Sequence, residues 1–195
     1  KASLHRGTVY LSAYEQRELL DSCMINAQSL ANRSLTTIEP EQIEVKKILE
    51  NIQLFFAEKL YKSNIQLEIV CPSTLLFEGD RSLNEFILLN MIGKSIYRVP
   101  KGGKVFVTAV QEKVGISLEI QDNGYSLSNV AEKLIKKSFN LFMEEKVFHT
   151  LCLENGVFYE HSRTEACLNL TKVILSNISK EIAPDNIVHL FGKNH

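Results

Sequence analysis

Residues 14–35 carry apolar side chains at every third or fourth position, the spacing of one face of an α-helix. The apolar stripe is narrow and includes small residues: Leu19, Leu20, Cys23, Met24, Ala27, Leu30 and Ala31. The pattern predicts a helix over 14–35. It fits two arrangements equally well, a helix packed on its own domain and one half of a helical hairpin that forms a dimer.

A second helical pattern follows a turn at residues 36–40. Because proline is tolerated at the first position of a helix, Glu39-Pro40 suits a helix start, and the apolar spacing beyond it predicts a helix to about Tyr61. Residues 65–69 alternate strictly between apolar and polar, as a half-buried strand does. Residues 74–77 suit a short edge strand.

The middle of the chain predicts one long helix and a β-hairpin. Ser82 and Glu85 have the spacing of an N-terminal capping box and predict the start of a helix that runs to about Tyr97. Valine-rich residues 104–110 and alternating residues 115–121 predict the two strands of the hairpin.

The remaining pattern completes an α/β order. Asp122-Asn123-Gly124 predicts a tight turn. Beyond it we expect a helix, an irregular segment, a second helix and a last strand, over residues 127–142, 143–163, 164–180 and 187–191. The order predicts an α/β two-layer sandwich, a mixed β-sheet with helices on one face, preceded by a helical segment. We place the helical segment at 1–38 and the α/β domain at 39–195.

Composition and charge are those of an ordinary globular domain. Among 195 residues, 22 Lys and Arg stand against 23 Asp and Glu, for a net charge of -1. The chain thus lacks the excess of basic residues that would indicate a nucleic-acid partner. No apolar run reaches the roughly 18 residues of a membrane span. We expect a cytoplasmic protein, or the cytoplasmic part of a larger or membrane-anchored one.

The four cysteines indicate no metal site. Cys23, Cys71, Cys152 and Cys167 form no CxxC pair and match no zinc spacing, so we expect free thiols in a reducing compartment. Three glycosylation sequons begin at Asn32, Asn169 and Asn177. We interpret them as chance matches, since no signal peptide is visible.

Four motifs follow one another in an order that points to a known family. LLNMIGKSI at 88–96 contains Asn90, and PKGGKV at 100–105 leads from helix to strand. LEIQDNG at 118–124 ends in Asp122 and Gly124, and FNLF at 139–142 contains Phe139 and Phe142. Together they resemble the catalytic and ATP-binding domain of sensor histidine kinases, which has relatives among type II topoisomerases and chaperones. The resemblance covers roughly residues 15–175, and residues 18–35 resemble the second helix of the kinases' dimerisation hairpin.

The resemblance implies a pocket for ATP and Mg²⁺. Asp122, beside Gly124, would accept a hydrogen bond from the adenine amino group. Asn90 would offer an oxygen to Mg²⁺, which prefers oxygen ligands. Glycine-rich turns would let backbone N–H groups approach the phosphates. Residues 143–163 would form the ATP lid, which Phe139 would help to position, and Phe142 of the same box would also belong to the nucleotide site.

Several positions depart from the family pattern. Lys94 stands one turn after Asn90, where a second asparagine is expected, and an ammonium group cannot ligate a cation. Lys94 would pair with a phosphate directly or be a solvated helix lysine. Tyr97 replaces a lysine and Ser126 a glycine. Residues 163–170, where a second glycine box would open the last helix, contain no glycine, and Ser162 with Glu165 has capping-box spacing instead. No histidine matches the phosphoacceptor motif.

Three functions fit these features. The first is a degenerate histidine kinase-like domain that acts in two-component signalling by docking or dimerisation, with weak or no use of Mg-ATP. The second is a divergent but active histidine kinase. The third is an interaction domain that has inherited only the fold. The expected partners are a response regulator or another signalling protein, and a second copy bound through residues 14–35.

Overall fold

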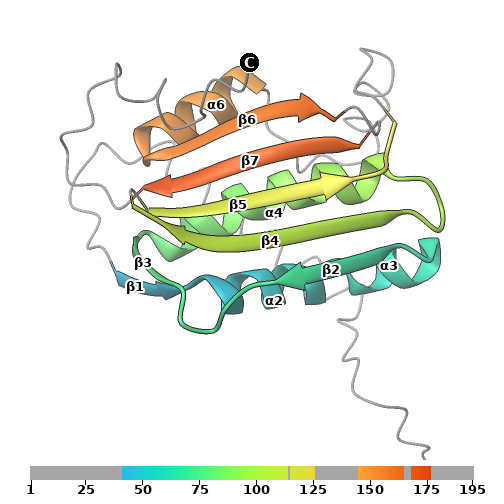
Figure 1. Ribbon diagram of the computed structural model, residues 1–195, viewed down its shortest axis with the longest axis horizontal. Coiled ribbons are helices and arrows are strands. Elements are labelled where there is room, and N and C mark those ends of the chain that lie inside the picture. The colour runs from blue at the N-terminus through green and yellow to red at the C-terminus, as the bar shows by residue number, and fades with distance from the viewer. Residues whose placement is uncertain (1–40, 114, 126–144, 165–167, 177–195) are drawn as a thin grey trace, which may run out of the picture.

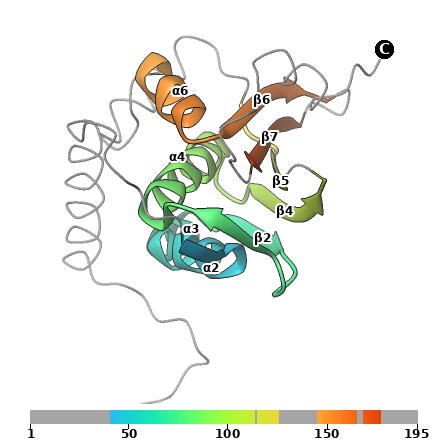
Figure 2. The same cartoon turned by 90° about the vertical axis from the view of Figure 1, so that its left-hand side faces the viewer.

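The computed structural model describes residues 41–113, 115–125, 145–164 and 168–176. They form two layers, a five-stranded sheet and a layer of helices on one of its faces (Figures 1 and 2). The predicted fold class, a two-layer α/β sandwich with a mixed sheet, is confirmed. The predicted helices over 14–35 and 127–142 and the predicted strand over 187–191 lie outside the described residues.

The sheet has the strand order β2-β4-β5-β7-β6. Its strands are β2 (Gln66–Val70), β4 (Lys104–Glu112), β5 (Gly115–Asp122), β6 (Val157–Arg163) and β7 (Asn169–Ser176). Only the β2–β4 pair is parallel, and the other three pairs are antiparallel. The hairpin predicted over 104–121 is therefore confirmed as β4 and β5, and the strand predicted over 65–69 as β2.

The core lies between the sheet and helix α4 (Arg81–Arg98), which runs behind the central strands in Figure 1. Alternate residues of β4 point into this core, since Val105, Val107 and Ala109 are buried and their neighbours face outward. Most of α4 is buried, because α2, α6 and the sheet surround it. A helix with such surroundings places its polar side chains inside the protein, where each needs a partner.

The expectation of one helix from Pro40 to Tyr61 is wrong. The structure has a strand β1 (Glu41–Glu44), then helices α2 (Val45–Phe55) and α3 (Ala57–Ser63). Strand β1 pairs with β3 (Leu76–Gly79) in a separate two-stranded sheet, which buries Ile43 opposite Phe77. The first helix ends at Phe56, whose backbone angles (φ -90°, ψ 4°) depart from helical values.

The predictions over 143–180 are also wrong. The segment expected to be irregular contains helix α6 (Glu145–Glu154) and strand β6, and the segment expected to be a helix contains strand β7. Val173, Ile174 and Leu175 are all buried. A strand covered on both faces loses its alternation, so its apolar run resembles that of a buried helix.

Helix α4 begins with a different cap from the one that the sequence suggested. Asp80 is the N-cap, and its Oδ1 accepts a hydrogen bond from the Leu83 N–H at 2.9 Å. Ser82 lies inside the helix and is exposed. The predicted capping box of Ser82 and Glu85 is thus replaced by a single carboxylate, which also interacts favourably with the helix dipole.

We expect Asp80→Ala to lower the free energy of unfolding by about 1 kcal/mol, because it leaves an N–H of the first turn without its acceptor. Urea denaturation measures the loss. Ser82→Ala is the matched control and should change stability by less than about 0.5 kcal/mol. Equal losses in the two variants would mean that the capping box forms in solution.

Candidate functional site

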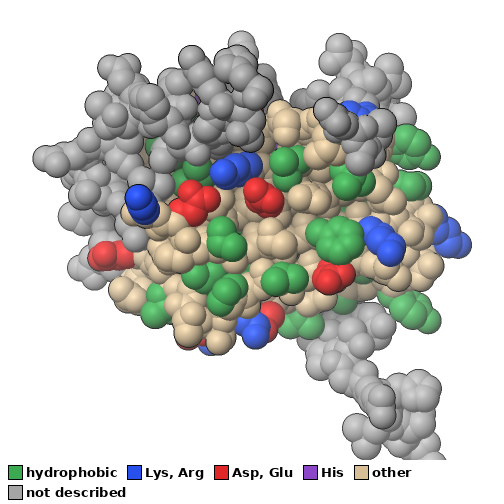
Figure 3. All heavy atoms as spheres, viewed as in Figure 1, with side chains coloured by type: hydrophobic (Ala, Val, Ile, Leu, Met, Phe, Trp, Pro, Cys, Tyr) green, Lys and Arg blue, Asp and Glu red, His purple; other side chains and the backbone are tan. Residues whose placement is uncertain are grey.

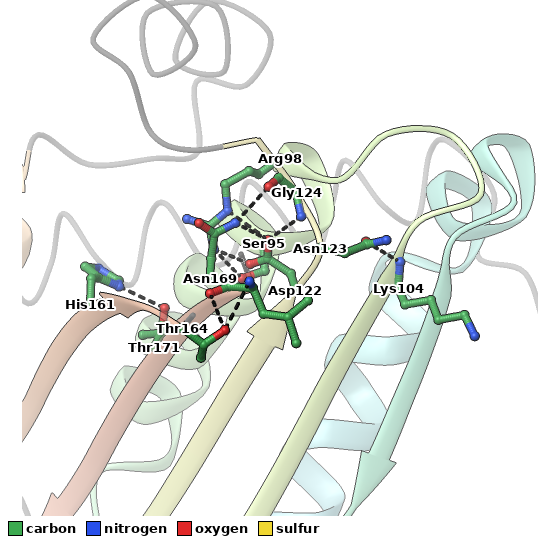
Figure 4. A network of polar contacts seen from close by, with 11 residues as sticks. Ser95, Arg98, Lys104, Asp122, Asn123, Gly124, His161, Thr164, Asn169 and Thr171 are labelled. Carbon is green, nitrogen blue, oxygen red and sulfur yellow. Dashed lines mark hydrogen bonds and ion pairs between the residues drawn. The ribbon is translucent and has the colours of Figure 1, made fainter. Parts of the chain in front are cut away.

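Three polar residues lie one turn apart on helix α4. Asn90, Lys94 and Arg98 are separated by four residues each, so they follow one side of the helix toward its C-terminal end. Arg98 is the last residue of α4 and is buried, with 6% of its surface exposed. It faces the end of β5, where Asp122 lies, and the start of β7, where Asn169 lies (Figure 4).

The Asp122 carboxylate is fully engaged by groups of the protein. Its Oδ1 accepts hydrogen bonds from Arg98 Nε at 3.1 Å, from Asn169 Nδ2 at 2.8 Å and from the Gly124 N–H at 2.9 Å. Its Oδ2 forms an ion pair with Arg98 Nη2. The side chains of Arg98 and Asp122 are 5% and 0% exposed. The pair is therefore a buried, bidentate salt bridge, with charge-assisted hydrogen bonds that bind more strongly than neutral ones.

The turn after β5 closes around Arg98. A Cβ atom on Gly124 would lie 2.7 Å from Arg98 Cγ and 2.8 Å from both the Arg98 carbonyl oxygen and Asp122 Oδ1. Asn169 Nδ2 also donates to the Gly124 carbonyl oxygen at 3.0 Å, and the Tyr125 N–H donates to the Arg98 carbonyl oxygen at 3.3 Å. Glycine is thus required here for the close approach of Arg98. The motif Asp-Asn-Gly has a structural use that involves no ligand.

Arg98 is not among the predicted site residues, and no sequence pattern predicts the contact made by Asn169. One signal for Arg98 was available, its position one turn beyond Lys94 on the side that carries Asn90. Asn169 was considered only as a sequon. Its side chain is buried and hydrogen-bonded to Asp122, so a glycan cannot attach to it in the folded protein.

Asn90 and Lys94 lie deeper along α4. Asn90 is completely buried, and its Nδ2 donates to the Phe86 carbonyl oxygen at 2.9 Å. Its Oδ1 is buried and has no hydrogen-bond partner in the described part of the chain. Lys94 is half-buried, and its Nζ lies 4.9 Å from the centre of the Phe148 ring on α6. Such a cation–π contact links the two helices.

Tyr97 also contacts a neighbouring helix. Its ring lies 4.9 Å from the Nζ of Lys59 on α3 and 6.3 Å from the Phe56 ring. Burial raises the pKa of Tyr97 to about 12, so the phenol stays neutral. This position therefore supplies a packed aromatic ring where the kinase pattern suggested a lysine.

The groups around Asp122 and Lys94 bear on the predicted site for Mg-ATP. Among the described residues, both oxygens of Asp122 already have partners: Oδ1 accepts from Arg98, Asn169 and the Gly124 N–H, and Oδ2 pairs with Arg98. Mg²⁺ prefers a shell of oxygen ligands, and Lys94 places an ammonium group one turn from Asn90. Within the described ranges, no three His, Cys, Asp or Glu residues lie close enough together to hold a metal ion.

The remaining predicted site residues, Phe139 and Phe142, lie outside the described residues, and so does Ser126. Helix α6 and strand β6 lie within 143–163, so this segment is not one irregular lid. Strand β7 begins at Asn169, so no helix begins in 163–170 and continues beyond it. The sequence between Gly124 and Gly156 contains no glycine at all. Helix α6 therefore begins without a glycine box, and the helix predicted over 164–180 also lacked one.

Two further predictions concern cysteines and membranes. Cys71 and Cys152 are free, and Cys152 is buried, which confirms the expectation of free thiols for these two. Burial raises the pKa of the Cys71 thiol, so it stays protonated at neutral pH. Among the described residues, no helix has the length and apolar character to cross a membrane.

Comparison with known proteins identifies the fold. No protein-family model matches the sequence, and no curated protein sequence matches it. Among solved structures, the nucleotide-free catalytic domain of histidine kinase ThkA is similar at a TM-score of 0.57 and 17% identity, over 72% of this chain and 98% of that one. Acinetobacter baumannii histidine kinase AdeS is similar at a TM-score of 0.59 and 18% identity, over 88% of each chain.

A third similar structure is ThkA in complex with the response regulator protein TrrA, at a TM-score of 0.61 and 17% identity, over 87% of this chain and 51% of that one. The chain therefore has the fold of the ATP-binding catalytic domain of sensor histidine kinases, at low sequence identity. This agrees with the resemblance carried by the sequence motifs.

We expect Arg98→Met and Asp122→Asn each to lower the free energy of unfolding by about 3 kcal/mol, because each leaves a buried partner without its counter-charge. The double variant should lose less than the sum, by about 1–3 kcal/mol. Urea denaturation of the four proteins measures this coupling. Arg81→Met, at the other end of α4, is the control. Additive losses would contradict the buried pair.

Proposed function

We propose that this chain is a degenerate histidine kinase-like domain that acts in two-component signalling mainly by docking and dimerisation, with weak or no use of Mg-ATP. The observation that carries the proposal is the engagement of Asp122 by Arg98, Asn169 and the Gly124 N–H. Under this proposal, Arg98 takes the place beside Asp122 where the amino group of a bound adenine would lie.

The interaction free energies favour the Arg98–Asp122 ion pair over a hydrogen bond between adenine and Asp122. For adenine to bind Asp122, its amino group would have to displace the Arg98 guanidinium. Leaving that charge buried without its partner costs about 3–5 kcal/mol. A hydrogen bond from a neutral amino group to a carboxylate returns only about 1.5–3 kcal/mol. The cost of the unpaired guanidinium exceeds the gain from the new hydrogen bond. Nucleotide binding through Asp122 is therefore unfavourable unless Arg98 finds another partner.

The charge along α4 supports the same conclusion. Lys94 stands where a second asparagine would complete the pair with Asn90, and its ammonium group lies over the Phe148 ring. A Mg²⁺ ion bound by Asn90 would be repelled by this nearby cation. Direct pairing of Lys94 with a phosphate remains the route by which a nucleotide could bind without metal.

The proposed partners follow from the fold. ThkA is found in complex with a response regulator, so we propose a response regulator or another signalling protein as the docking partner. We also propose that residues 14–35 pair with those of a second copy, and that the protein acts in the cytoplasm. We propose no nucleic-acid partner, because the net charge is -1.

One observation favours the runner-up, a divergent but active histidine kinase. Asn90 Oδ1 is buried without a hydrogen-bond partner among the described residues, and a buried unpaired oxygen is costly. A ligand that supplied a donor or a cation there would remove this cost. The candidate nucleotide residues under that hypothesis are Asn90, Lys94, Asp122, Gly124, Phe139 and Phe142.

We expect calorimetric titration with Mg-ATP to show no saturable binding up to about 1 mM, equivalent to less than about 4 kcal/mol of binding free energy. Arg98→Met, which frees Asp122, should gain adenine-dependent binding if the variant stays folded, and the control Arg81→Met should not. A micromolar dissociation constant for the unmodified chain, abolished by Asp122→Asn, would support the active kinase instead.

We expect sedimentation equilibrium to show a dimer that Met24→Lys converts to a monomer, because a charge would enter the apolar stripe of 14–35. Ser22→Lys is the control, since Ser22 lies on the opposite side of the predicted helix. A dimer that survives Met24→Lys, or a monomer at all concentrations, would argue against pairing through this segment.

A further inference from the structure

The sheet face seen in Figure 3 carries side chains of several kinds. Val70, Phe106 and Val110 are exposed on β2 and β4, and hydrophobic, acidic and basic side chains lie interspersed over this face. Hydrophobic side chains dispersed among charged ones are normal on a protein surface, so this face does not specify a partner. A more specific chemistry belongs to the turn after β5, at the dipeptide Asn123-Gly124.

An asparagine followed by glycine is the dipeptide most prone to spontaneous deamidation. The backbone nitrogen of the glycine loses its proton and attacks the side-chain Cγ of the asparagine, which closes a succinimide ring. The asparagine Nδ2 takes up a proton and leaves as ammonia, and water then opens the ring to give aspartate or isoaspartate. Glycine favours the attack because it has no Cβ atom to hinder the approach. The chain contains two such dipeptides, Asn123-Gly124 and Asn155-Gly156.

The two groups that must meet at Asn123-Gly124 are held by other partners (Figure 4). The Gly124 N–H donates to Asp122 Oδ1 at 2.9 Å, and Asn123 Oδ1 accepts from the Lys104 N–H at 2.8 Å. The attacking nitrogen is therefore bound to a carboxylate, and the side chain that it would attack is bound to strand β4. A carboxylate that accepts this hydrogen bond also favours the protonated form of the nitrogen.

The main chain beyond Asn123 is also held in place. The Tyr125 N–H donates to the Arg98 carbonyl oxygen at 3.3 Å, and the Gly124 carbonyl oxygen accepts from Asn169 Nδ2 at 3.0 Å. A Cβ atom on Gly124 would lie 2.7 Å from Arg98 Cγ, so the turn has no room to move toward the helix. Ring closure therefore requires the turn to move away from Arg98 first.

We propose that Asn123 is a site of spontaneous deamidation that the Arg98–Asp122 ion pair keeps closed. While the pair is formed, Gly124 stays bound to Asp122 and the reaction is slow. When the pair opens, the turn is released, and Asn123 reacts as it does in an unfolded chain. Because a reaction through an open form follows the population of that form, its rate measures how often the ion pair opens.

The reaction changes the turn permanently. Conversion of Asn123 to isoaspartate adds a carbon atom to the main chain before Gly124, and this displaces the Gly124 N–H from Asp122 Oδ1. Conversion to aspartate keeps an acceptor for the Lys104 N–H but places a second carboxylate next to Asp122 in the chain. A brief opening of the ion pair is thereby converted into a lasting change at the candidate site.

Asn155-Gly156 provides a reference within the same molecule. It lies between α6 and β6, where the Gly156 N–H donates to the Leu153 carbonyl oxygen at 3.2 Å and Asn155 Nδ2 to the Leu151 carbonyl oxygen at 2.8 Å. Neither hydrogen bond involves the ion pair. Global unfolding releases both dipeptides, whereas opening of the ion pair releases only Asn123-Gly124.

The test incubates the full chain under native conditions and in urea, and peptide mass spectrometry measures the fractions of Asn123 and Asn155 converted to the acid. In the unmodified folded chain, Asn123 should convert at least about tenfold more slowly than in urea. Arg98→Met should raise the Asn123 rate at least about tenfold, because the unpaired Asp122 carboxylate is then hydrated only when the turn opens. The Asn155 rate should stay within about twofold, and the control Arg81→Met should change neither rate.

A second, milder variant covers the case in which Arg98→Met unfolds the chain and raises both rates together. Asn169→Ala removes the hydrogen bonds to Asp122 Oδ1 and the Gly124 carbonyl oxygen and keeps the ion pair. It should raise the Asn123 rate by about threefold or more and leave the Asn155 rate unchanged.

Two results would overturn the proposal. The first is conversion of Asn123 in the unmodified folded chain as fast as in urea. The second is an Asn123 rate that, in both Arg98→Met and Asn169→Ala, does not rise or rises only together with the Asn155 rate. Neither result depends on whether ATP binds.

Discussion

The salt bridge between Arg98 and Asp122 holds the functional end of the molecule together. It connects the last residue of α4 to the last residue of β5, and Asn169 extends it to the first residue of β7. Removing either charge leaves the other buried without a partner, at a cost comparable with a large part of a domain's net stability. The turn at Gly124 and the packing of the helix end both follow from this pair.

The same interaction is the basis of the proposed function. In the described part of the chain, both oxygens of the Asp122 carboxylate already have partners within the protein. The framework of a nucleotide-binding fold is kept, since the sheet and α4 need no ligand to bury their apolar faces. The proposed change of function, from nucleotide use to docking, therefore requires no change of architecture.

The parts of the fold that could be predicted from the sequence are those with local signals. Burial alternates along β4 because one of its faces is largely exposed, and α4 has helical spacing and a turn at each end. The prediction of a helix where strand β7 lies was wrong because the last residues of β7 are buried on both faces. The prediction of a helix where strand β1 lies was wrong because the pairing of β1 with β3, more than thirty residues later, outweighs the helical signal around Pro40.

The sequence by itself determined the fold, through the order of its motifs, and the chemical identity of Lys94, Asp122 and Gly124. Only the tertiary structure decided what Asp122 binds. Its partners Arg98 and Asn169 lie 24 and 47 residues away along the chain. No local pattern encodes such contacts, because a buried charge can be matched by any donor that the fold brings within hydrogen-bonding distance.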